Sequence, residues 1–198
     1  MLEYFKEDVY RYFDKAEKQR GVTRWMFLKK IWNTNTLWII FLYRFGRWLN
    51  YEFRIPIVKT VLKIFYHVAS TIIPLMYNTH IQIKAEIGKG LYLGHYGGIW
   101  IGPVKMGMNC NLSQEVTIGI GGKGEHRGVP ELGNNVYIGP GAKIFGKITI
   151  GDNVAIGANS VVSKNISDNA VVVGNPARIV GYEGSSGLID LDEFDNLL

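Results

Sequence analysis

His95 lies among three glycines, Gly94, Gly97 and Gly98, where the backbone can turn and a bound molecule can approach closely. A neutral imidazole at such a point can remove the proton of a hydroxyl group as its oxygen attacks a carbonyl carbon. These residues therefore predict a general base. A single histidine at a corner is more often only exposed to solvent, and the residue types alone leave both interpretations open.

The other histidines and the single cysteine offer less chemistry. His126 belongs to the polar segment Gly121–Pro130, where it either contacts a substrate or is solvated. His67 lies in an apolar run, and His80 has no evident partner in the sequence. The four histidines lack the paired spacing of a zinc site, so we expect no metal. Cys110 excludes an internal disulfide and is best interpreted as a small core residue in a reducing compartment.

A six-residue period predicts the elements that position these side chains. An aliphatic residue recurs at every sixth position, at Ile138, Ile144, Ile150, Ile156 and Val162. Six-residue repeats are typical of a parallel β-helix, in which each repeat is a short strand and a turn and three repeats make one coil. The aliphatic residues are expected to point inward and to stack from coil to coil.

The same period continues upstream with two interruptions. Two earlier runs are each spaced by six, namely Ile87, Leu93 and Ile99, and then Met106, Leu112 and Ile118. We interpret the one extra residue between the runs as a bulge, and residues 119–135, which do not repeat, as an excursion loop. An antiparallel sandwich would need alternation with a period of two, which these positions do not follow.

The chain is therefore expected to be mainly β with an α-helical N-terminal part. A parallel β-helix of hexapeptide repeats would occupy residues 81–180, after a basic, aromatic-rich helical domain at residues 1–80. Residues 181–198 would form an exit turn and a mobile acidic tail. Helices are predicted at residues 2–20, 23–33, 35–52 and 56–76, with Pro56 at the start of the last helix and Pro74 at its end.

Positive charge is concentrated in the predicted helical part. Residues 1–80 hold 13 Lys/Arg and 6 Asp/Glu, whereas residues 81–198 hold 9 and 11. The basic residues alternate with aliphatic and aromatic ones and form no polar patch, so we expect no nucleic-acid partner. Such cationic, Trp-rich helices favour peripheral attachment to an anionic membrane surface. The alternative is a helical domain that packs on the β-helix or on a neighbouring subunit.

Two apolar segments, residues 37–43 and 55–77, raise the question of a membrane span. The first is too short, and the second carries Lys59 and Lys63 near its middle, so neither is expected to cross a bilayer. Residues 1–20 are charged throughout and show no cleavable signal, so a cytoplasmic protein is expected.

Several short motifs occur together in the repeat region, namely Gly88–Gly90, Leu93–His95, Val116–Gly119, Gly122–Lys123, Ile138–Ile144, Ile156–Val162 and Gly174–Val180. In this order and spacing, the chain from Ile87 to Gly181 resembles the hexapeptide-repeat acyltransferases, and among them the serine-acetyltransferase-like branch. The resemblance implies a left-handed β-helix, a homotrimer, acetyl-CoA as co-substrate without a metal, and His95 as the catalytic base. Glu115 is a candidate to orient His95 from the next coil.

The resemblance also implies where the donor binds. In this family the CoA arm lies between two β-helices, held by backbone groups of successive coils and by basic residues near the C-terminal coils. The matching candidates are Gly122, Lys123, Gly139, Ala142, Ala158, Lys164 and Arg178. Lys143 and Lys147 are equally suitable partners for the phosphates, unless they serve only solubility.

The chain departs from the serine-specific pattern of that family. Serine acetyltransferases carry one aspartate directly before the catalytic histidine, another fifteen residues before it, and an Arg-His pair in the excursion loop. Here these positions hold Gly94, His80 and, without gaps, Gly128 and Val129. A site without these charged contacts binds a zwitterion such as serine much less selectively, so free serine is a poor candidate acceptor.

The loop Gly121–Pro130, joined to basic aromatic helices, resembles the loops of transferases that acetylate sugars of capsules, exopolysaccharides and O-antigens. This resemblance, with the missing charges, implies an acetyl-CoA-dependent O-acetyltransferase that acts on a hydroxyl of an envelope saccharide. By the same resemblance the acceptor would be lipid-linked at the cytoplasmic face of the inner membrane, and Glu125, His126 and Arg127 would contact it. One alternative is a serine O-acetyltransferase of cysteine biosynthesis. Another is a non-catalytic, membrane-associated β-helix scaffold.

Overall fold

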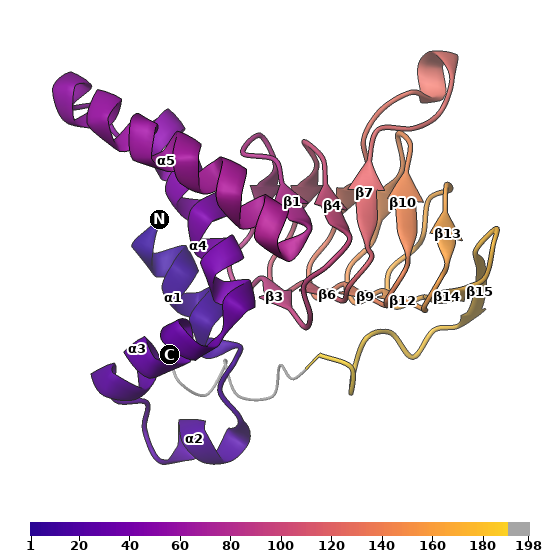
Figure 1. Cartoon of the computed structure of the whole chain (residues 1–198). Helices are drawn as coiled ribbons and strands as arrows, with labels where there is room; N and C mark the ends of the chain where they lie inside the picture. Colours follow the sequence, from indigo (N-terminus) through magenta and orange to yellow (C-terminus); the bar gives the residue numbers. More distant parts are fainter. Residues whose placement is uncertain (190–198) are drawn as a thin grey trace.

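The computed structural model describes residues 1–189, which form a helical part followed by a solenoid of short strands (Figure 1). Residues 190–198, with the acidic side chains Asp190, Asp192, Glu193 and Asp195, lie outside the described residues. The helical elements are α1 (Leu2–Tyr10), α2 (Lys15–Gln19), α3 (Arg24–Asn33), α4 (Asn35–Arg47), the π-helical turn η1 (Trp48–Glu52) and α5 (Pro56–Tyr77).

Two helix boundaries differ from the sequence prediction. The predicted helix 2–20 is broken, because Asp14 is extended and caps α2, accepting a hydrogen bond from the Glu17 amide at 2.8 Å. Pro74 does not end α5, which continues to Tyr77. A proline one turn before the end removes only one backbone hydrogen bond, and the helix stops where Asn78 adopts a left-handed conformation with φ 45°.

The solenoid has three parallel sheets, one on each side of a triangular coil. The first sheet holds β1 (Thr79–Ile81), β4 (Ile99–Ile101), β7 (Thr117–Gly119), β10 (Lys143–Phe145) and β13 (Val161–Val162). The second holds β2 (Glu86–Ile87), β5 (Lys105–Met106), β8 (Glu131–Leu132) and β11 (Thr149–Ile150). The third holds β3 (Tyr92–Leu93), β6 (Asn111–Leu112), β9 (Tyr137–Ile138), β12 (Ala155–Ile156), β14 (Val171–Val173) and the antiparallel β15 (Arg178–Gly181).

Aliphatic residues stack inside the solenoid, as the period of six predicts. In the first sheet Ile118 is in register with Ile144, which is in register with Val162, and all three are buried. Equivalent columns fill the other two walls. The predicted fold, a helical N-terminal part and a left-handed parallel β-helix, is confirmed.

The interruption upstream lies at a different place from the one predicted. Ile101, and not Ile99, is in register with Ile118, so the step from Leu93 to Ile101 spans eight positions instead of six. The extra residues enlarge the corner between β3 and β4, and the following step from Ile101 to Met106 is one residue short. The predicted bulge after Ile99 is therefore wrong, and the enlarged corner is the one that carries His95.

The excursion after β7 is shorter than predicted. It contains the 3-10 turn η2 (Gly124–His126) and is closed by mutual backbone hydrogen bonds of 3.0 Å between Gly121 and Gly128. The chain is back in the solenoid at β8, where Leu132 takes an inward position in register with Met106. The loop therefore ends before residue 131, and not at residue 135.

The segment after β15 does not leave the molecule as the predicted tail would. It runs back along the third sheet, where the Ser185 hydroxyl donates to the carbonyl oxygen of Asn135 at 2.6 Å. Ile189 is buried, and Asn111 donates to the carbonyl oxygen of Leu188 at 3.5 Å. Figure 1 shows this strap beneath the coils. Residues 182–189 therefore pack against the third sheet, where the sequence predicted a free tail.

Candidate active site

His95 lies on the enlarged corner between the third and first sheets. Gly97 and Gly98 have φ values of 107° and 68°, which side chains with a Cβ rarely adopt, so both glycines are needed to form this turn. The imidazole is exposed, and none of the described residues forms a hydrogen bond or ion pair with it. The corner thus presents a nitrogen base to solvent, where a substrate can reach it.

Residues from the helical part fix the position of this corner. Because β3 is the first strand of its sheet, the backbone of Leu93 has no earlier strand to pair with. The Tyr12 hydroxyl accepts from the Leu93 amide and donates to the Leu93 carbonyl, each at 3.0 Å. Burial raises the pKa of the Tyr12 phenol, so the group keeps the proton that it donates.

The end of α5 holds the other side of the corner. The Thr79 hydroxyl accepts a hydrogen bond from the Gly97 amide at 3.0 Å, and the rings of Tyr77 and Tyr96 meet edge to face at 5.1 Å. Sequence reasoning missed these residues and Tyr12, since they are separated from the corner in sequence and belong to no repeat.

Glu115 occupies the equivalent corner of the next coil. Its amide donates to the Gly97 carbonyl at 2.8 Å, and its Cα would lie 3.1 Å from a Cβ at position 98. Lys143, one coil further, donates to the Glu115 carbonyl and to the Thr117 hydroxyl. The structure therefore brings Glu115 directly under the His95 corner, where both its backbone and the start of its exposed side chain lie against Gly98.

The same corner continues along the solenoid as a column of small residues. Gly139 and Ala142 lie there in the coil after Glu115, and Ala158 in the next coil. A Cβ at Gly139 would come within 2.8 Å of the Ala158 nitrogen, so only glycine allows these coils to stack. A long, narrow molecule could lie along this column, which begins at His95.

The basic candidates occupy different places. Lys164 is exposed at the corner after β13, which is not the corner of His95, and Arg178 is exposed on β15. Lys147 lies at the base of the excursion, where its amide donates to the His126 carbonyl at 3.2 Å. Lys143, in contrast, directly follows Ala142 of the column, and its side chain donates to the Glu115 carbonyl at the same corner.

The excursion leaves the solenoid after β7, at the C-terminal ends of the strands of the first sheet, whereas the His95 corner precedes β4 at their N-terminal ends. Lys123, Glu125, His126 and Arg127 are all exposed on it, and Figure 1 shows the loop standing out from the coils. Gly122 has φ 83°, and a Cβ there would clash with the His126 carbonyl, which fixes the shape of the loop. The structure does not bring the loop residues to the His95 of the same chain.

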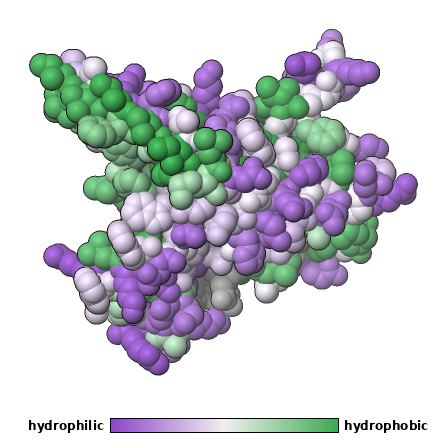
Figure 2. Space-filling model, in the orientation of Figure 1, coloured by the Kyte–Doolittle hydropathy of each residue, from purple (hydrophilic) through white to green (hydrophobic). Residues whose placement is uncertain are grey.

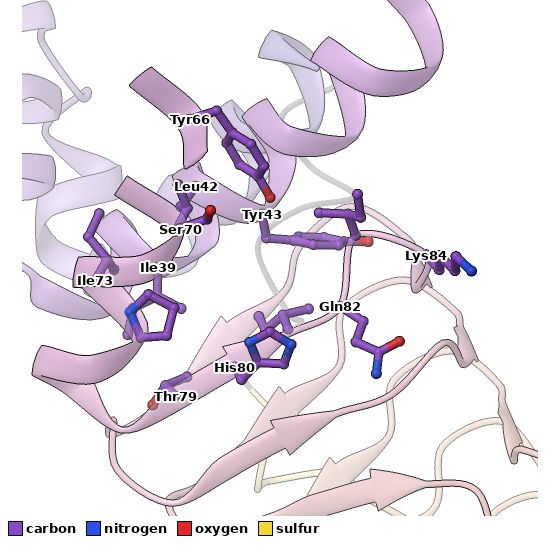
Figure 3. A pocket seen from close by; sticks show the side chains of 13 residues that line it. Ile39, Leu42, Tyr43, Tyr66, Ser70, Ile73, Thr79, His80, Gln82 and Lys84 are labelled. Atoms are coloured by element: carbon purple, nitrogen blue, oxygen red, sulfur yellow. The ribbon is translucent and has the colours of Figure 1, made fainter. Parts of the chain in front are cut away.

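A cavity of about 340 Å³ lies between α5 and the first coil (Figure 3). Its wall from α5 includes Tyr66 and Ser70, and its wall from β1 and the following turn includes His80, Gln82 and Lys84. The His80 ring also packs, tilted by 39°, against the Trp100 ring, with the ring centroids 5.2 Å apart. His80, for which the sequence indicated no chemistry, therefore lines a pocket beside the strand whose Thr79 holds the His95 corner.

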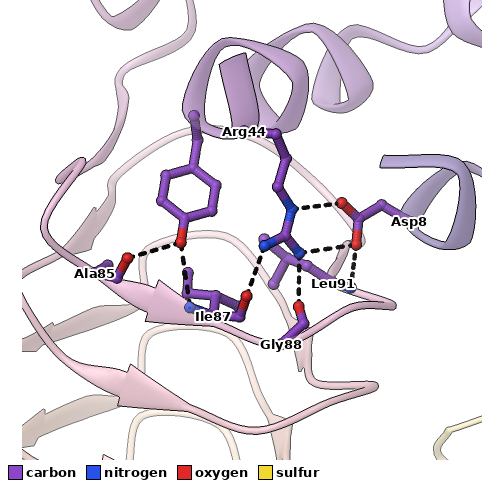
Figure 4. Close-up of polar contacts among 7 residues, drawn as sticks. Asp8, Arg44, Ala85, Ile87, Gly88 and Leu91 are labelled. Carbon is purple, nitrogen blue, oxygen red and sulfur yellow. Dashed lines mark hydrogen bonds and ion pairs between the residues drawn. The ribbon is translucent and has the colours of Figure 1, made fainter. Parts of the chain in front are cut away.

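A buried ion pair joins the helical part to the first coil (Figure 4). Asp8 accepts two hydrogen bonds from the Arg44 guanidinium, at 2.8 and 3.0 Å, and one from the Leu91 amide at 2.7 Å. Arg44 donates in addition to the carbonyl oxygens of Ile87 and Gly88, each at 2.6 Å. The Asp8–Arg44 pair thus satisfies the backbone groups of the corner that precedes β3, and it fixes the helices against the site.

Among residues 1–189 no three His, Cys, Asp or Glu side chains lie close enough together to hold a metal ion. Cys110 is buried, and burial raises the pKa of its thiol to about 12. Its location fits the predicted core role and leaves it no place in the site.

Comparison with known sequences identifies the repeat. Residues 130–164 match the family described as bacterial transferase hexapeptide (six repeats). Over 143 residues the chain is 36% identical to serine acetyltransferase of Synechococcus elongatus, covering 72% of this chain and 55% of the relative. It is 44% identical over 101 residues to serine acetyltransferase of Staphylococcus xylosus, covering 50% and 47%. The chain therefore spans about half the length of the curated relatives it matches.

Comparison with solved structures extends the likeness to the helical part. Serine acetyltransferase from Brucella abortus superposes with a TM-score of 0.71 at 28% identity, over 93% of this chain and 70% of that one. The same enzyme in complex with coenzyme A superposes with a TM-score of 0.71 at 29% identity, over 92% and 68%. Residues 130–164 thus carry hexapeptide repeats of the bacterial transferase type. Within that class the chain resembles the serine-acetyltransferase-like branch.

Proposed function

We propose that this protein is an acyltransferase that moves the acetyl group of acetyl-CoA to a hydroxyl oxygen, with His95 as the general base. The observation that carries this proposal is the exposed imidazole on an enlarged, glycine-rich corner, at the head of a column of small residues. The similarity to serine acetyltransferases, one of them solved with coenzyme A, supports the donor. Because acetyl-CoA is made and used inside cells, the reaction is assigned to the cytoplasm.

The chemistry requires one proton transfer and one exchange of bonds at the thioester carbon. The neutral imidazole takes the proton of the acceptor hydroxyl as its oxygen attacks that carbon. When the tetrahedral intermediate collapses, the carbon–sulfur bond breaks, and the imidazolium returns the proton to the leaving thiolate. The products are the O-acetyl ester and free CoA, and His95 regains its neutral form.

The comparisons favour serine as the acceptor over the saccharide that the sequence alone favoured. The named relatives are serine acetyltransferases, and the likeness extends from the solenoid to the helices. The ammonium group of serine would need an anionic partner, and the exposed carboxylate of Glu115 lies one coil from His95. Serine O-acetylation is therefore the first acceptor hypothesis.

A specific observation keeps a saccharide hydroxyl as the second candidate. Gly94 and His80 stand where carboxylates are expected in a serine-specific site, and no carboxylate of the described residues contacts His95. A neutral, hydroxyl-rich acceptor does not need them, and His80, Gln82 and Lys84 offer hydrogen bonds in the neighbouring cavity. Capsule, exopolysaccharide or O-antigen precursors have this chemistry.

The proposed site is completed by a second copy of the chain in a homotrimer. Within one chain the excursion and the His95 corner lie at opposite ends of the strands of the first sheet. A neighbouring β-helix packed on that sheet would bring its loop, with Lys123, Glu125, His126 and Arg127, toward His95. The groove between the two copies would also bring Lys164 and Arg178 toward the CoA phosphates.

The acceptor is tested by measuring CoA release from acetyl-CoA by the purified chain, with free serine in one series and oligosaccharides in another. Release that depends on serine supports the first hypothesis, and release that depends on a saccharide supports the second. A chain that does not bind acetyl-CoA at all would contradict both and favour a non-catalytic scaffold.

A further inference from the structure

Helix α5 exposes an apolar face along its whole length. It is the one helix among residues 1–189 that is long and apolar enough to cross a membrane. Ile57, Phe65 and Leu75, spread from its first turn to its last, are 82%, 69% and 78% exposed. Figure 2 shows this face as a continuous hydrophobic ridge at the edge of the molecule. The same ridge includes Val61, Ile64, Val68, Ile72 and Met76.

The opposite face of α5 already has partners, so the ridge is the side that remains free. Tyr66 packs against Phe45 of α4, and its ring lies against Gly46. Lys59 donates to the carbonyl oxygens of Asn50 and Phe53, at 3.2 and 3.0 Å. These contacts hold α5 on α4 and η1, and they direct its other face outward. A helix that left this position to span a bilayer would lose them.

The charges around the ridge are cationic. Arg54 and Lys63 are exposed at the start and in the first half of α5, and α5 has no acidic residue. Over residues 1–80 the exposed cations are Lys6, Lys15, Arg20, Arg24, Lys29, Arg54 and Lys63, whereas the exposed carboxylates are Glu3, Asp14 and Glu52. A second copy of the chain packed on this ridge would bring like charge against like charge, whereas an anionic surface would be attracted to it.

Helix α3 adds a second apolar group with the same character. Trp25 and Trp32 are each 74% exposed, on the same helix as the exposed cations Arg24 and Lys29. Figure 1 shows α3 at the same helical end of the molecule as α5 but separated from it by α1 and α4, so this group is a surface distinct from the ridge. Tryptophan with flanking cations is the combination enriched where protein meets the headgroup region of a bilayer.

From these observations we infer that the outer face of α5 docks the protein on an anionic lipid surface. The helix lies in the headgroup region, with its apolar face toward the acyl chains and Arg54 and Lys63 at the phosphates. The last residue of α5, Tyr77, and the first residue of β1, Thr79, contact the His95 corner, so docking places that corner beside the membrane. This inference goes beyond the proposed acetyl transfer and does not depend on which acceptor is used.

Flotation of the full chain with lipid vesicles tests the inference. We expect binding to vesicles of phosphatidylcholine mixed with phosphatidylglycerol, much weaker binding to phosphatidylcholine alone, and release by salt. The triple variant Ile57→Ser, Ile64→Ser, Phe65→Ser should lose at least ~100-fold in partition, because three exposed apolar side chains are removed. Lys63→Gln should lose about fivefold.

Matched variants control for unrelated effects. Ile120→Ser with Val180→Ser removes exposed aliphatic residues from the solenoid, and Lys105→Gln removes an exposed charge there; neither should change flotation. Equal flotation of the triple variant and the unaltered chain would overturn the inference. So would a triple variant that changes the oligomeric state without vesicles, because the ridge would then join copies. Resistance of the bound protein to alkaline carbonate would mean that α5 inserts fully, which also contradicts surface docking.

The acetyl-transfer activity toward a soluble acceptor separates this inference from the proposed function. The triple variant should retain that activity while it loses vesicle binding, since Ile57, Ile64 and Phe65 do not touch the His95 corner. Loss of docking with retained catalysis supports the inference alone. A protein that binds vesicles and transfers no acetyl group would leave docking intact and contradict the enzyme assignment.

Discussion

The buried thiol of Cys110 is expected to make the solenoid less stable as the pH rises into the alkaline range. Burial raises the pKa of this group to about 12 from its ordinary value of 9.0, so the folded state binds the proton more tightly than the unfolded state. The associated stability is complete below pH 9 and is lost as the pH rises toward 12. We expect Cys110→Ala to show a smaller decrease of the unfolding midpoint across this range, measured by urea titration. An identical pH dependence in both proteins would contradict the assignment.

Tyr12 is predicted to act on catalysis through the position of the His95 corner. Tyr12→Phe leaves the Leu93 amide and carbonyl without their partner, which costs about 1–3 kcal/mol of folding free energy. If the corner shifts as a result, kcat should fall while the KM for acetyl-CoA changes little. Tyr4→Phe, at an exposed residue of the same region, is the control. A purely structural role would lower the unfolding midpoint and leave kcat of the folded enzyme unchanged.

At the scale of elements, the helices are fixed to the β-helix by the buried pair Asp8–Arg44, whose side chains are 0% and 5% exposed. Arg44→Met removes the partner of a buried carboxylate and leaves the Ile87 and Gly88 carbonyls unsatisfied. We expect a loss of about 3–5 kcal/mol in the free energy of unfolding. The exposed pair Lys105–Glu131 offers a matched control, and Lys105→Met should cost less than about 1 kcal/mol. Equal effects in urea denaturation would contradict the structural role of the buried pair.

The elements also show which features a sequence can predict. The period of six identified the coils because each inward residue contacts its equivalents above and below, so the pattern is local and repeated. It could not place the two extra residues at the His95 corner, since Ile99 and Ile101 are both aliphatic and both buried, and only strand register distinguishes them. Tyr12 and Thr79 were missed because hydrogen bonds to single backbone groups leave no periodic signal.

At the scale of the whole molecule, the separation of the excursion from His95 predicts a site shared between copies. One variant is His95→Ala, which keeps the loop, and the other is the double variant His126→Ala, Arg127→Ala, which keeps the base. A mixed trimer of the two would include interfaces at which an intact loop from one chain meets an intact His95 from another. We therefore expect coexpression of the two inactive variants to restore part of the CoA release. No recovery, when mixed trimers are verified by mass spectrometry, would contradict the shared site and confine the chemistry to a single chain.

The most direct test of the central proposal compares the unaltered chain with His95→Ala in two measurements, acetyl-CoA binding by calorimetry and acceptor-dependent CoA release. A general base contributes about 10²–10⁴-fold to rate, so release should fall by that factor while acetyl-CoA binding stays within a factor of a few. Retained release by His95→Ala, with the binding of acetyl-CoA unchanged, would show that His95 is not the base and would contradict the account at its centre.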